Sequence, residues 1–373
     1  MTERERILAV YRGTRPDRVP FMLDLSHWFY QRTQKPWDLS RAYTEPETEL
    51  IAVHRRYGAG FYLPNLAAFV TTRYPEGVRA TTQRVETPDG LEIISRFETP
   101  TGAIERRRRW EPQTYAWGIS QWGIRTPGEL AVFAEALSGR SFEAHWERYT
   151  AWVEAVGDLG VVYLPLGYSA LGHLLHYWMG VEGFFYAAAD YPELLTRVVE
   201  RVNANTLDLV DLVANSPAEI VIMGDNLSSD VQPPPVFERW SGDFYRAAIR
   251  RLQACGKKVA VHIDGRLRGA LRMVCNCGAD AADAVTPTPM GDLTAAQCRA
   301  EVGEHFILSG GVSPDLWLPN VPLARFERAA IDWLELRQSS PALIANAGDQ
   351  VPPGADERRI ERLRELVEVY GRW

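Results

Sequence analysis

"KVAVHIDGRLRGALRMVCNCGADAADAVTP", residues 258–287, indicates the fold class, because it contains two short apolar runs separated by a longer stretch. The runs "KVAVHID" and "ADAVTP" are typical of parallel strands that are buried on both faces. His262 and Asp264 stand two residues apart at the end of the first run, so an extended backbone directs both side chains to one face. We expect them to share a ligand or an ion, unless a neighbouring carboxylate simply satisfies the histidine in an ordinary loop.

The same pattern recurs along the chain, with longer helix-like stretches between the apolar runs. In residues 192–216, for example, leucines and valines return every three or four residues, as on a helix with one buried face. The other candidate strands are "RVPFMLD" (18–24), "FYLPN" (61–65), "GVVYLPLG" (160–167), "EIVIMGDN" (219–226), "HFILSGG" (305–311) and "ALIANAG" (342–348). Eight such strands predict one domain over residues 1–373, a (β/α)₈ TIM barrel. An open doubly wound sheet is the alternative, but no G-x-G-x-x-G motif follows the first strand.

The segment from about 78 to 115 has a different pattern. It contains "ETPDGLEIISRFETPTGAIERRRRW" (86–110), which alternates apolar and polar residues and is broken at "PDG" and "PTG". This predicts a β-hairpin or small sheet inserted into the barrel. Strand alternation would send half of the basic run Arg106–Arg109 to each face. We expect a solvated hairpin edge there, with the binding of an anionic group as the alternative.

Composition excludes several classes of protein. The chain has 373 residues and a net charge of −7, which disfavours nucleic-acid binding and favours a small-molecule substrate. No run of 18 apolar residues is present, so no membrane span is expected. The N-terminus does not resemble a signal peptide, and the four cysteines show no framework spacing, so we expect a cytoplasmic protein with reduced thiols. The oligomeric state is not indicated.

Polar residues follow the candidate strands, and in a TIM barrel the carboxyl ends of the strands converge on the active site. We predict Asp225, His262, Asp264 and Asp349 as catalytic residues. The predicted substrate-binding residues are Asp24, His27, Asn65, Tyr168, Asn226, Thr286 and Asn346. Aromatic residues near these strand ends suit an apolar or methylated cationic group, although core packing is the commoner explanation for any single one of them.

Four stretches resemble the uroporphyrinogen decarboxylase superfamily, and together they span nearly the whole chain in order. They are "RERILAVYRGTRPDRVPF" (4–21), "GYSALGHLLHYWMGVEGFFYAAADYPELLTRVVE" (167–200), "VTPTPMGDLTAAQCRAEVGEHFILSGGVSP" (285–314) and "NAGDQVPPGADERRIERLRELVEVYG" (346–371). The superfamily includes the decarboxylase itself and zinc methyltransferases that act with corrinoid proteins and coenzyme M. The resemblance implies the same barrel fold.

The sequence departs from the decarboxylase branch at the positions that bind substrate carboxylates. That branch has two arginines in the loop after the first strand, where "LDLSHWFYQRT" (23–33) offers only Arg32. It also has an essential aspartate after the second strand, where "NLAAFVTT" (65–72) contains no acid. The resemblance therefore implies the methyltransferase-like branch.

In that branch a zinc ion is held by a His-x-Cys pair and a distant cysteine. His262 and Asp264 match the pair with aspartate for cysteine, and Asp349 stands near the place of the distant cysteine. The resemblance thus implies a divalent ion, most simply zinc, held by these three residues. Two aspartates carry the same charge as the two cysteine thiolates, so the net charge of the site is unchanged, but carboxylate oxygens are harder ligands than thiolate sulfurs. The alternative is that the metal is lost and the aspartates bind substrate directly. Three roles stay open for Asp225: a fourth ligand of the ion, a base, or a partner that orients His262.

The sequence therefore predicts a methyltransferase-like enzyme that moves a methyl group between a small methylated substrate and a corrinoid protein, a thiol or a folate. The corrinoid is expected on a separate protein. Two alternatives stay open: a metal-independent decarboxylase or lyase acting on a small carboxylated substrate, and a non-catalytic protein that docks a corrinoid protein.

Overall fold

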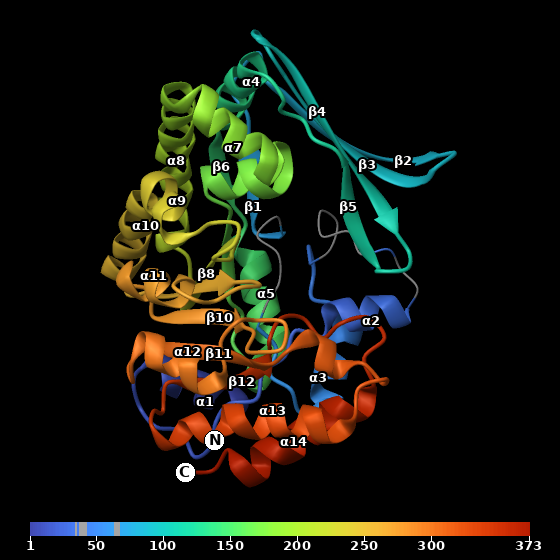
Figure 1. Cartoon of the computed structure of the whole chain (residues 1–373), viewed down its shortest axis with the longest axis vertical. Helices are drawn as coiled ribbons and strands as arrows, with labels where there is room; N and C mark the ends of the chain where they lie inside the picture. The colour runs from blue at the N-terminus through green and yellow to red at the C-terminus, as the bar shows by residue number, and fades with distance from the viewer. Residues whose placement is uncertain (34–35, 37–42, 63–67) are drawn as a thin grey trace.

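The centre of the molecule is a six-stranded parallel sheet, in a computed structural model that describes residues 1–33, 36, 43–62 and 68–373 (Figure 1). The strands are β7 Leu164–Gly167, β8 Ile220–Leu227, β9 Lys258–Ile263, β10 Ala281–Val285, β11 Ile307–Val312 and β12 Leu343–Ala347. Each pairs with the next along the chain, in the order β12-β11-β10-β9-β8-β7. Every residue of β10, β11 and β12 is buried, which explains their continuous apolar sequences.

Two short segments, residues 20–23 and 60–62, join the edges of this sheet. The N–H of Met22 donates to the carbonyl of Ala345 in β12 (3.0 Å), and the N–H of Tyr163 donates to the second segment (2.7 Å). The two segments also bond to each other through single parallel bridges. The fold is therefore the expected (β/α)₈ barrel. Among the described residues, however, single hydrogen bonds rather than a regular eight-stranded ladder complete its ring.

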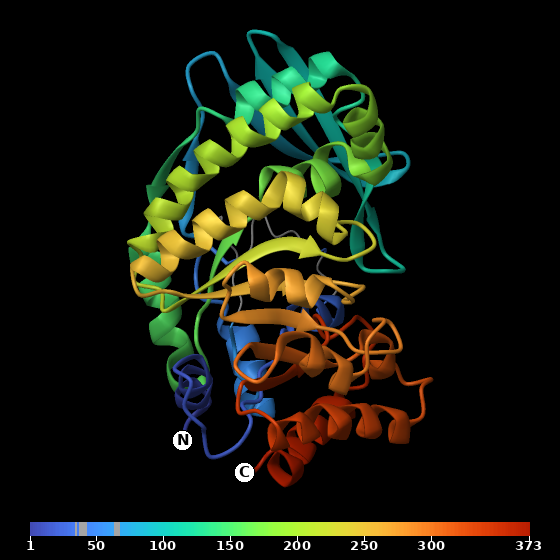
Figure 2. The same cartoon turned by 60° about the vertical axis from the view of Figure 1, so that its left-hand side comes forward.

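Helices lie around the outside of the strands, and the two chain termini lie side by side at one end (Figures 1 and 2). The helices are α1 Glu3–Tyr11, α2 Ser26–Arg32, α3 Thr48–Tyr57, α4 Pro127–Leu137, α5 Trp146–Val156, α6 Ala170–His173, α7 Gly180–Asp190, α8 Pro192–Ala214, α9 Pro234–Phe237, α10 Asp243–Ala254, α11 Ala270–Asn276, α12 Ala295–Val302, α13 Leu323–Glu335 and α14 Glu357–Tyr370. Short helical turns are η2 Gly157–Leu159, η3 Leu174–Trp178, η4 Glu238–Gly242, η5 Pro314–Trp317 and η6 Leu336–Gln338. The expected leucine and valine stripe of α8 is its buried face.

The inserted segment is larger than a hairpin over 78–115. It is an antiparallel sheet of four sequential strands, β2 Arg79–Thr87, β3 Gly90–Thr99, β4 Gly102–Glu111 and β5 Ala116–Gln121. The sheet is flanked in sequence by β1 Val70–Arg73 and β6 Ser141–Ala144, which pair with each other. An apolar cluster that includes Phe97, Phe133 and Trp178 packs one face of the sheet against α4 and η3. The sheet thereby stands as a wall beside the barrel (Figure 1).

In the part of the chain that the structure describes, no helix combines the length and the apolar character needed to cross a bilayer. The cysteines Cys255, Cys275, Cys277 and Cys298 are all free thiols.

Candidate functional site

Asp225 lies near the end of β8 and is held by the loop after β7. It is fully buried, and Ser169 donates both its backbone N–H (2.6 Å) and its hydroxyl to the carboxylate. Burial raises the pKa of Asp225 to about 6, although the bonds from Ser169 oppose this rise. A Cβ atom on Gly172 would stand 2.3 Å from Oδ1 of Asp225, so the helix approaches this closely only because that position is glycine. Asp225 can therefore exchange a proton near neutral pH.

His262 in β9 faces a second carboxylate, Asp283 of β10. Nδ1 of His262 lies 3.6 Å from Oδ2 of Asp283, which is 1% exposed. Burial lowers the pKa of His262, but the contact with Asp283 and the charges of Asp349 and Asp264 outweigh burial and raise the pKa to about 9. The imidazole is therefore cationic at neutral pH.

A buried chain of polar groups fixes Asp283. Ser309 in β11 donates its hydroxyl to Oδ1 of Asp283 (3.0 Å). Asn346 in β12 donates its amide to both Ser309 (3.4 Å) and the hydroxyl of Tyr62 (3.3 Å). Asn346, a predicted substrate-binding residue, thus uses its side chain within this chain of bonds. Side chains from β10, β11, β12 and the segment 60–62 thus form the chain of bonds behind His262.

Asp349 lies in the turn after β12, close to the same histidine. Burial raises the pKa of Asp349 to about 7, and the charges of Asp264 and Asp24 raise it further, while the charge of His262 lowers it. Because these effects act between charges, the turn must place Asp349 near enough to His262, Asp264 and Asp24 for their charges to reach it. Asp24, His262, Asp264 and Asp349 therefore lie close enough for their charges to act on one another, although the described side chains are not grouped around one centre.

Two of these acids have well-defined local partners. Asp24 is buried and accepts hydrogen bonds from the backbone of Ser26 (2.9 Å) and from Nε2 of Gln350 (3.1 Å), which ties it to the turn of Asp349. The backbone N–H of Asp264 donates to Leu227 at the end of β8 (2.8 Å). The charge of Asp264 acts on the ionisation of both His262 and Tyr168, so Asp264 lies between the two halves of the site.

Tyr168 and Asn226 form the other side of the site. The Tyr168 hydroxyl donates to Oδ1 of Asn226 (3.2 Å), and Asn226 has a left-handed backbone (φ 46°) that asparagine tolerates well. Tyr177 packs edge-on against the Tyr168 ring, with their centroids 4.8 Å apart. Burial is the largest cause that raises the pKa of Tyr168, so its hydroxyl stays protonated.

Two further predicted residues, His27 and Thr286, use their side chains in contacts with backbone carbonyls. His27 contacts the backbone carbonyl of Tyr115 (2.6 Å) in the inserted segment, and Thr286 is buried and donates to the carbonyl of Gly348. These contacts tie neighbouring segments together. Asn65 lies outside the described residues.

Whether a metal ion fits this site depends on how the side chains that could bind it are arranged. Among the described residues, no three His, Cys, Asp or Glu side chains are grouped as they would be around one ion. Nδ1 of His262 is directed to Asp283 instead. The side chains of His262, Asp264 and Asp349 therefore do not fit an ion as they stand, and the divalent ion stays a prediction.

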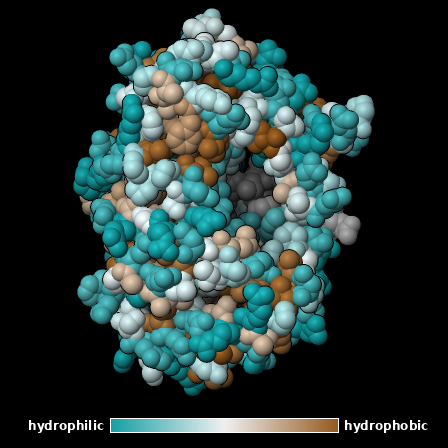
Figure 3. All heavy atoms as spheres, in the orientation of Figure 1, coloured by the Kyte–Doolittle hydropathy of each residue, from teal (hydrophilic) through white to brown (hydrophobic). Residues whose placement is uncertain are grey.

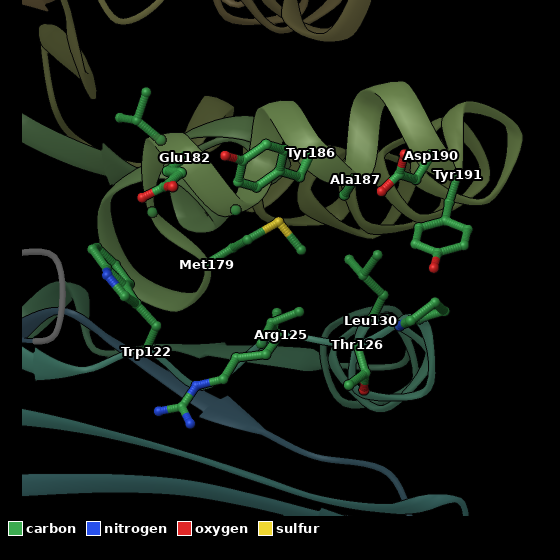
Figure 4. Close-up of a pocket in the computed structure, with 15 residues that line it drawn as sticks. Trp122, Arg125, Thr126, Leu130, Met179, Glu182, Tyr186, Ala187, Asp190 and Tyr191 are labelled. Atoms are coloured by element: carbon green, nitrogen blue, oxygen red, sulfur yellow. The ribbon is translucent and has the colours of Figure 1, made fainter.

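The molecule is hollowed on the face between the inserted sheet and the barrel (Figure 3). A cavity of about 430 Å³ lies between the two units and reaches Gly167 and Tyr168 at the end of β7. A second cavity, of about 410 Å³, lies between α4 and α7 (Figure 4). None of the residues that line the second cavity comes from a parallel strand end, so it lies apart from the acidic cluster.

Sequence reasoning missed Asp283, which orients His262. The available signal was a carboxylate inside "ADAV", a run otherwise typical of a strand buried on both faces. An acid at such a position has to be paired or protonated.

Comparisons with known proteins agree with this fold. Residues 173–370, more than half of the chain, match the family model described as "Uroporphyrinogen decarboxylase (URO-D)". A search of curated proteins finds no significant match. Among solved structures, a methyltransferase from Methanosarcina mazei superposes with a TM-score of 0.64 and 15% identity over 99% of each chain. At this identity the likeness is one of fold.

Proposed function

The chain belongs to the uroporphyrinogen decarboxylase family, and from that premise we propose that it is a methyltransferase-like enzyme acting on a small methylated substrate. The observation that carries the proposal is the convergence of His262, Asp264 and Asp349 with Asp24 at the carboxyl ends of the barrel strands, where barrel enzymes do their chemistry. The same fold serves the methyltransferase from Methanosarcina mazei, which supports the choice of reaction class.

Methyl transfer from an ether or alcohol oxygen needs an acid at the leaving atom. The bond between the methyl carbon and the heteroatom breaks, the methyl group bonds to the acceptor, and the heteroatom keeps the electron pair and takes up a proton. Asp349, whose pKa is raised to about 7, holds that proton at neutral pH and can give it up. We therefore assign Asp349 as the general acid.

His262 supports this acid through its charge. As a cation held by Asp283, it stabilises the carboxylate that Asp349 becomes after donating its proton. Tyr168, Asn226 and Asp225 form the opposite wall, where Tyr168 offers an aromatic face to an apolar methylated group. The methyl acceptor we propose is a corrinoid protein, a thiol or a folate, with the corrinoid carried on a separate protein.

The experiment that tests this proposal uses free cob(I)alamin as the acceptor. The purified protein is mixed anaerobically with one of three methyl donors, a methoxyarene, a quaternary methylammonium or methanol, and methylcobalamin is followed by its absorbance. We expect methylation from at least one donor with wild-type protein. With the two oxygen donors Asp349→Asn should cause a strong loss, whereas the quaternary methylammonium leaves as a neutral amine and needs no acid. Failure with all three donors would contradict the proposal.

A second candidate function is a metal-independent carboxy-lyase, favoured by the raised pKa of Asp225, about 6, because a neutral carboxylic acid can protonate the carbanion left when CO₂ departs. Uroporphyrinogen itself is not the substrate we propose. Arg32, the one arginine of the loop after the first segment, pairs with Glu357 (3.0 Å) and stacks on Trp28. Anaerobic incubation with uroporphyrinogen should give no coproporphyrinogen, and measurable formation would reverse this choice.

A further inference from the structure

The cavity between the inserted sheet and the barrel has a strongly one-sided charge. Its lining includes Arg96, Arg106 and Arg140 and, among the described residues, no aspartate or glutamate. This is unusual in a chain whose net charge is −7. Arg96 pairs with Glu98 (3.1 Å), so the question is what balances the other two cations.

Arg106 is held without a carboxylate. Its guanidinium lies over the rings of Tyr177 (4.6 Å) and Trp178 (5.1 Å), and one Nη donates weakly to the carbonyl of Tyr177 (3.4 Å). Its Nε is buried without a hydrogen-bond partner. The next residue, Arg107, pairs instead with Glu105 (2.8 Å) and Glu92 (3.7 Å). The expectation of a solvated basic edge is therefore wrong for Arg106, because Tyr177 and Trp178 of η3 cover its guanidinium.

Arg140 reaches the same cavity from the segment between α4 and β6. Its Nε donates to the carbonyl of Leu137 (3.0 Å) and to Asn205 (3.1 Å), and one Nη donates to Thr206 (3.2 Å). All these acceptors are neutral, so no negative charge in the described part of the chain balances the guanidinium. The other Nη makes no hydrogen bond to these residues and remains a donor for a ligand.

His173 lies within reach of the charges of both arginines. Nδ1 of His173 is buried without a partner, and the ring also lines the cavity. Burial lowers the pKa of His173 to about 3, and the charges of Arg140 and Arg106 lower it further. The imidazole is therefore neutral at neutral pH and offers a hydrogen-bond donor between two cations.

Uncompensated buried cations cost free energy unless an anion balances them. We propose that this cavity is an anion-binding subsite, in which Arg106, Arg140 and His173 hold the carboxylate or phosphate group of a small organic ligand. The volume of about 430 Å³ lies in the range of small-ligand sites, and Phe97, Tyr177 and Trp178 provide apolar walls for the body of the ligand. Fork-shaped guanidinium groups suit both anions.

The place of the cavity connects it to the site of chemistry. Tyr168 lines the cavity and also bonds to Asn226 at the barrel mouth, so a ligand anchored by its anion extends toward Asp225 and Asp264. This part rests on the proposed function and names its substrate class, a methylated organic anion. Anion binding itself is independent of any methyl transfer.

The test is a calorimetric titration of the protein in low-salt buffer, with inorganic phosphate in one arm and benzoate in the other. We expect saturable binding of at least one probe, and the stronger arm identifies the anion. Arg106→Gln and Arg140→Gln should each weaken binding by roughly tenfold or more, because each removes a hydrogen bond to a charged group. Arg84→Gln, an exposed position in the same inserted sheet, should bind like wild type.

A second measurement uses wild-type protein alone, so it does not depend on the folding of a variant. The imidazole signals of His173 in NMR spectra should shift on addition of the same probe, with saturation at the calorimetric concentration. No saturable binding of either probe to wild-type protein, or equal binding by wild type and Arg106→Gln, would overturn the subsite. Neither result depends on whether cobalamin becomes methylated.

Discussion

The barrel mouth and the cavity beneath the inserted sheet carry opposite charges, although Tyr168 takes part in both. At the mouth, the charges of Asp264, Asp283 and Asp349 all act on the cation His262. In the cavity, Arg106 and Arg140 stand without any carboxylate among the described residues. The two regions are nevertheless close neighbours.

We infer from this difference that the unpaired arginines of the cavity serve the binding of a ligand rather than the stability of the fold. Arg107 and Arg109, on the other face of β4, do pair with Glu92, so acids were available to the inserted sheet. Leaving Arg106 unpaired fits an anchor for an anion. Crowding acids at the mouth, in contrast, raises the pKa of Asp349 and so keeps a proton ready.

The largest expected effect is on catalysis at the mouth. Asp349→Asn removes the proton donor and should lower kcat/KM for methyl transfer by roughly 10²- to 10⁴-fold. Asp243→Asn, at an exposed position on α10, is the control and should leave the rate unchanged. Wild-type activity should fall as pH rises through about 7, because Asp349 then loses its proton. A flat pH profile would remove Asp349 from this role.

The next effect is on stability. Gly172→Ala places a Cβ against Asp225 and should lower the free energy of unfolding by about 1–3 kcal/mol, as overpacking does. The matched control is Gly224→Ala, because a Cβ at Gly224 meets no atom within 4 Å. Urea denaturation of both variants measures the difference. Equal stabilities would show that the contact between α6 and Asp225 is not tight.

A smaller effect concerns the charge of His262. Asp283→Asn should lower the pKa of His262 from about 9, measured by NMR titration of the imidazole. Because the folded pKa lies above the ordinary value of 6.5, this ionisation stabilises the wild type fully below about pH 6.5. The stabilisation is lost as pH rises through about 9, and the variant should lose less stability over that window. An unchanged pKa would contradict the pairing with Asp283.

The smallest expected effect concerns the predicted metal. If Zn²⁺ or Mn²⁺ binds at His262, Asp264 and Asp349, it must displace the proton of His262 and, near pH 7, that of Asp349. Affinity should therefore rise by up to about tenfold per pH unit toward pH 9, and more steeply near pH 7. Asp264→Ala should weaken this binding. Negligible binding by chelator-stripped wild-type protein at all these pH values would discard the ion.

The sequence predicted most of the barrel, because strands buried on both faces need continuous apolar runs. It overstated the first strand, residues 18–24, which pairs only through single bridges. Most of the second, residues 63–65 of 61–65, lies outside the described residues. It underestimated the inserted sheet, because β5 continues beyond residue 115. The bounds of a strand depend on the segments that pair with it, and the local sequence pattern does not identify those segments.

The candidate site was predicted in part for the same reason. Strand ends converge in any barrel, so the grouping of Asp24, His262, Asp264 and Asp349 follows from their positions. The partner of His262 depends on register between β9 and β10, where Asp283 stands opposite His262. Likewise, alternation divides the basic run between two faces, but only the packing of η3 decides that Arg106 faces a cavity lined by aromatic rings.

The most direct test of the whole account compares two methyl donors that differ in one anionic group. 4-Methoxybenzoate and methoxybenzene are each incubated anaerobically with wild-type protein and cob(I)alamin, and the initial rate of methylcobalamin formation is measured at equal concentrations. We expect the carboxylate donor to react at least about tenfold faster, because Arg106 and Arg140 anchor it while Asp349 protonates the leaving oxygen. Equal rates, or no methylation from either donor, would contradict the account.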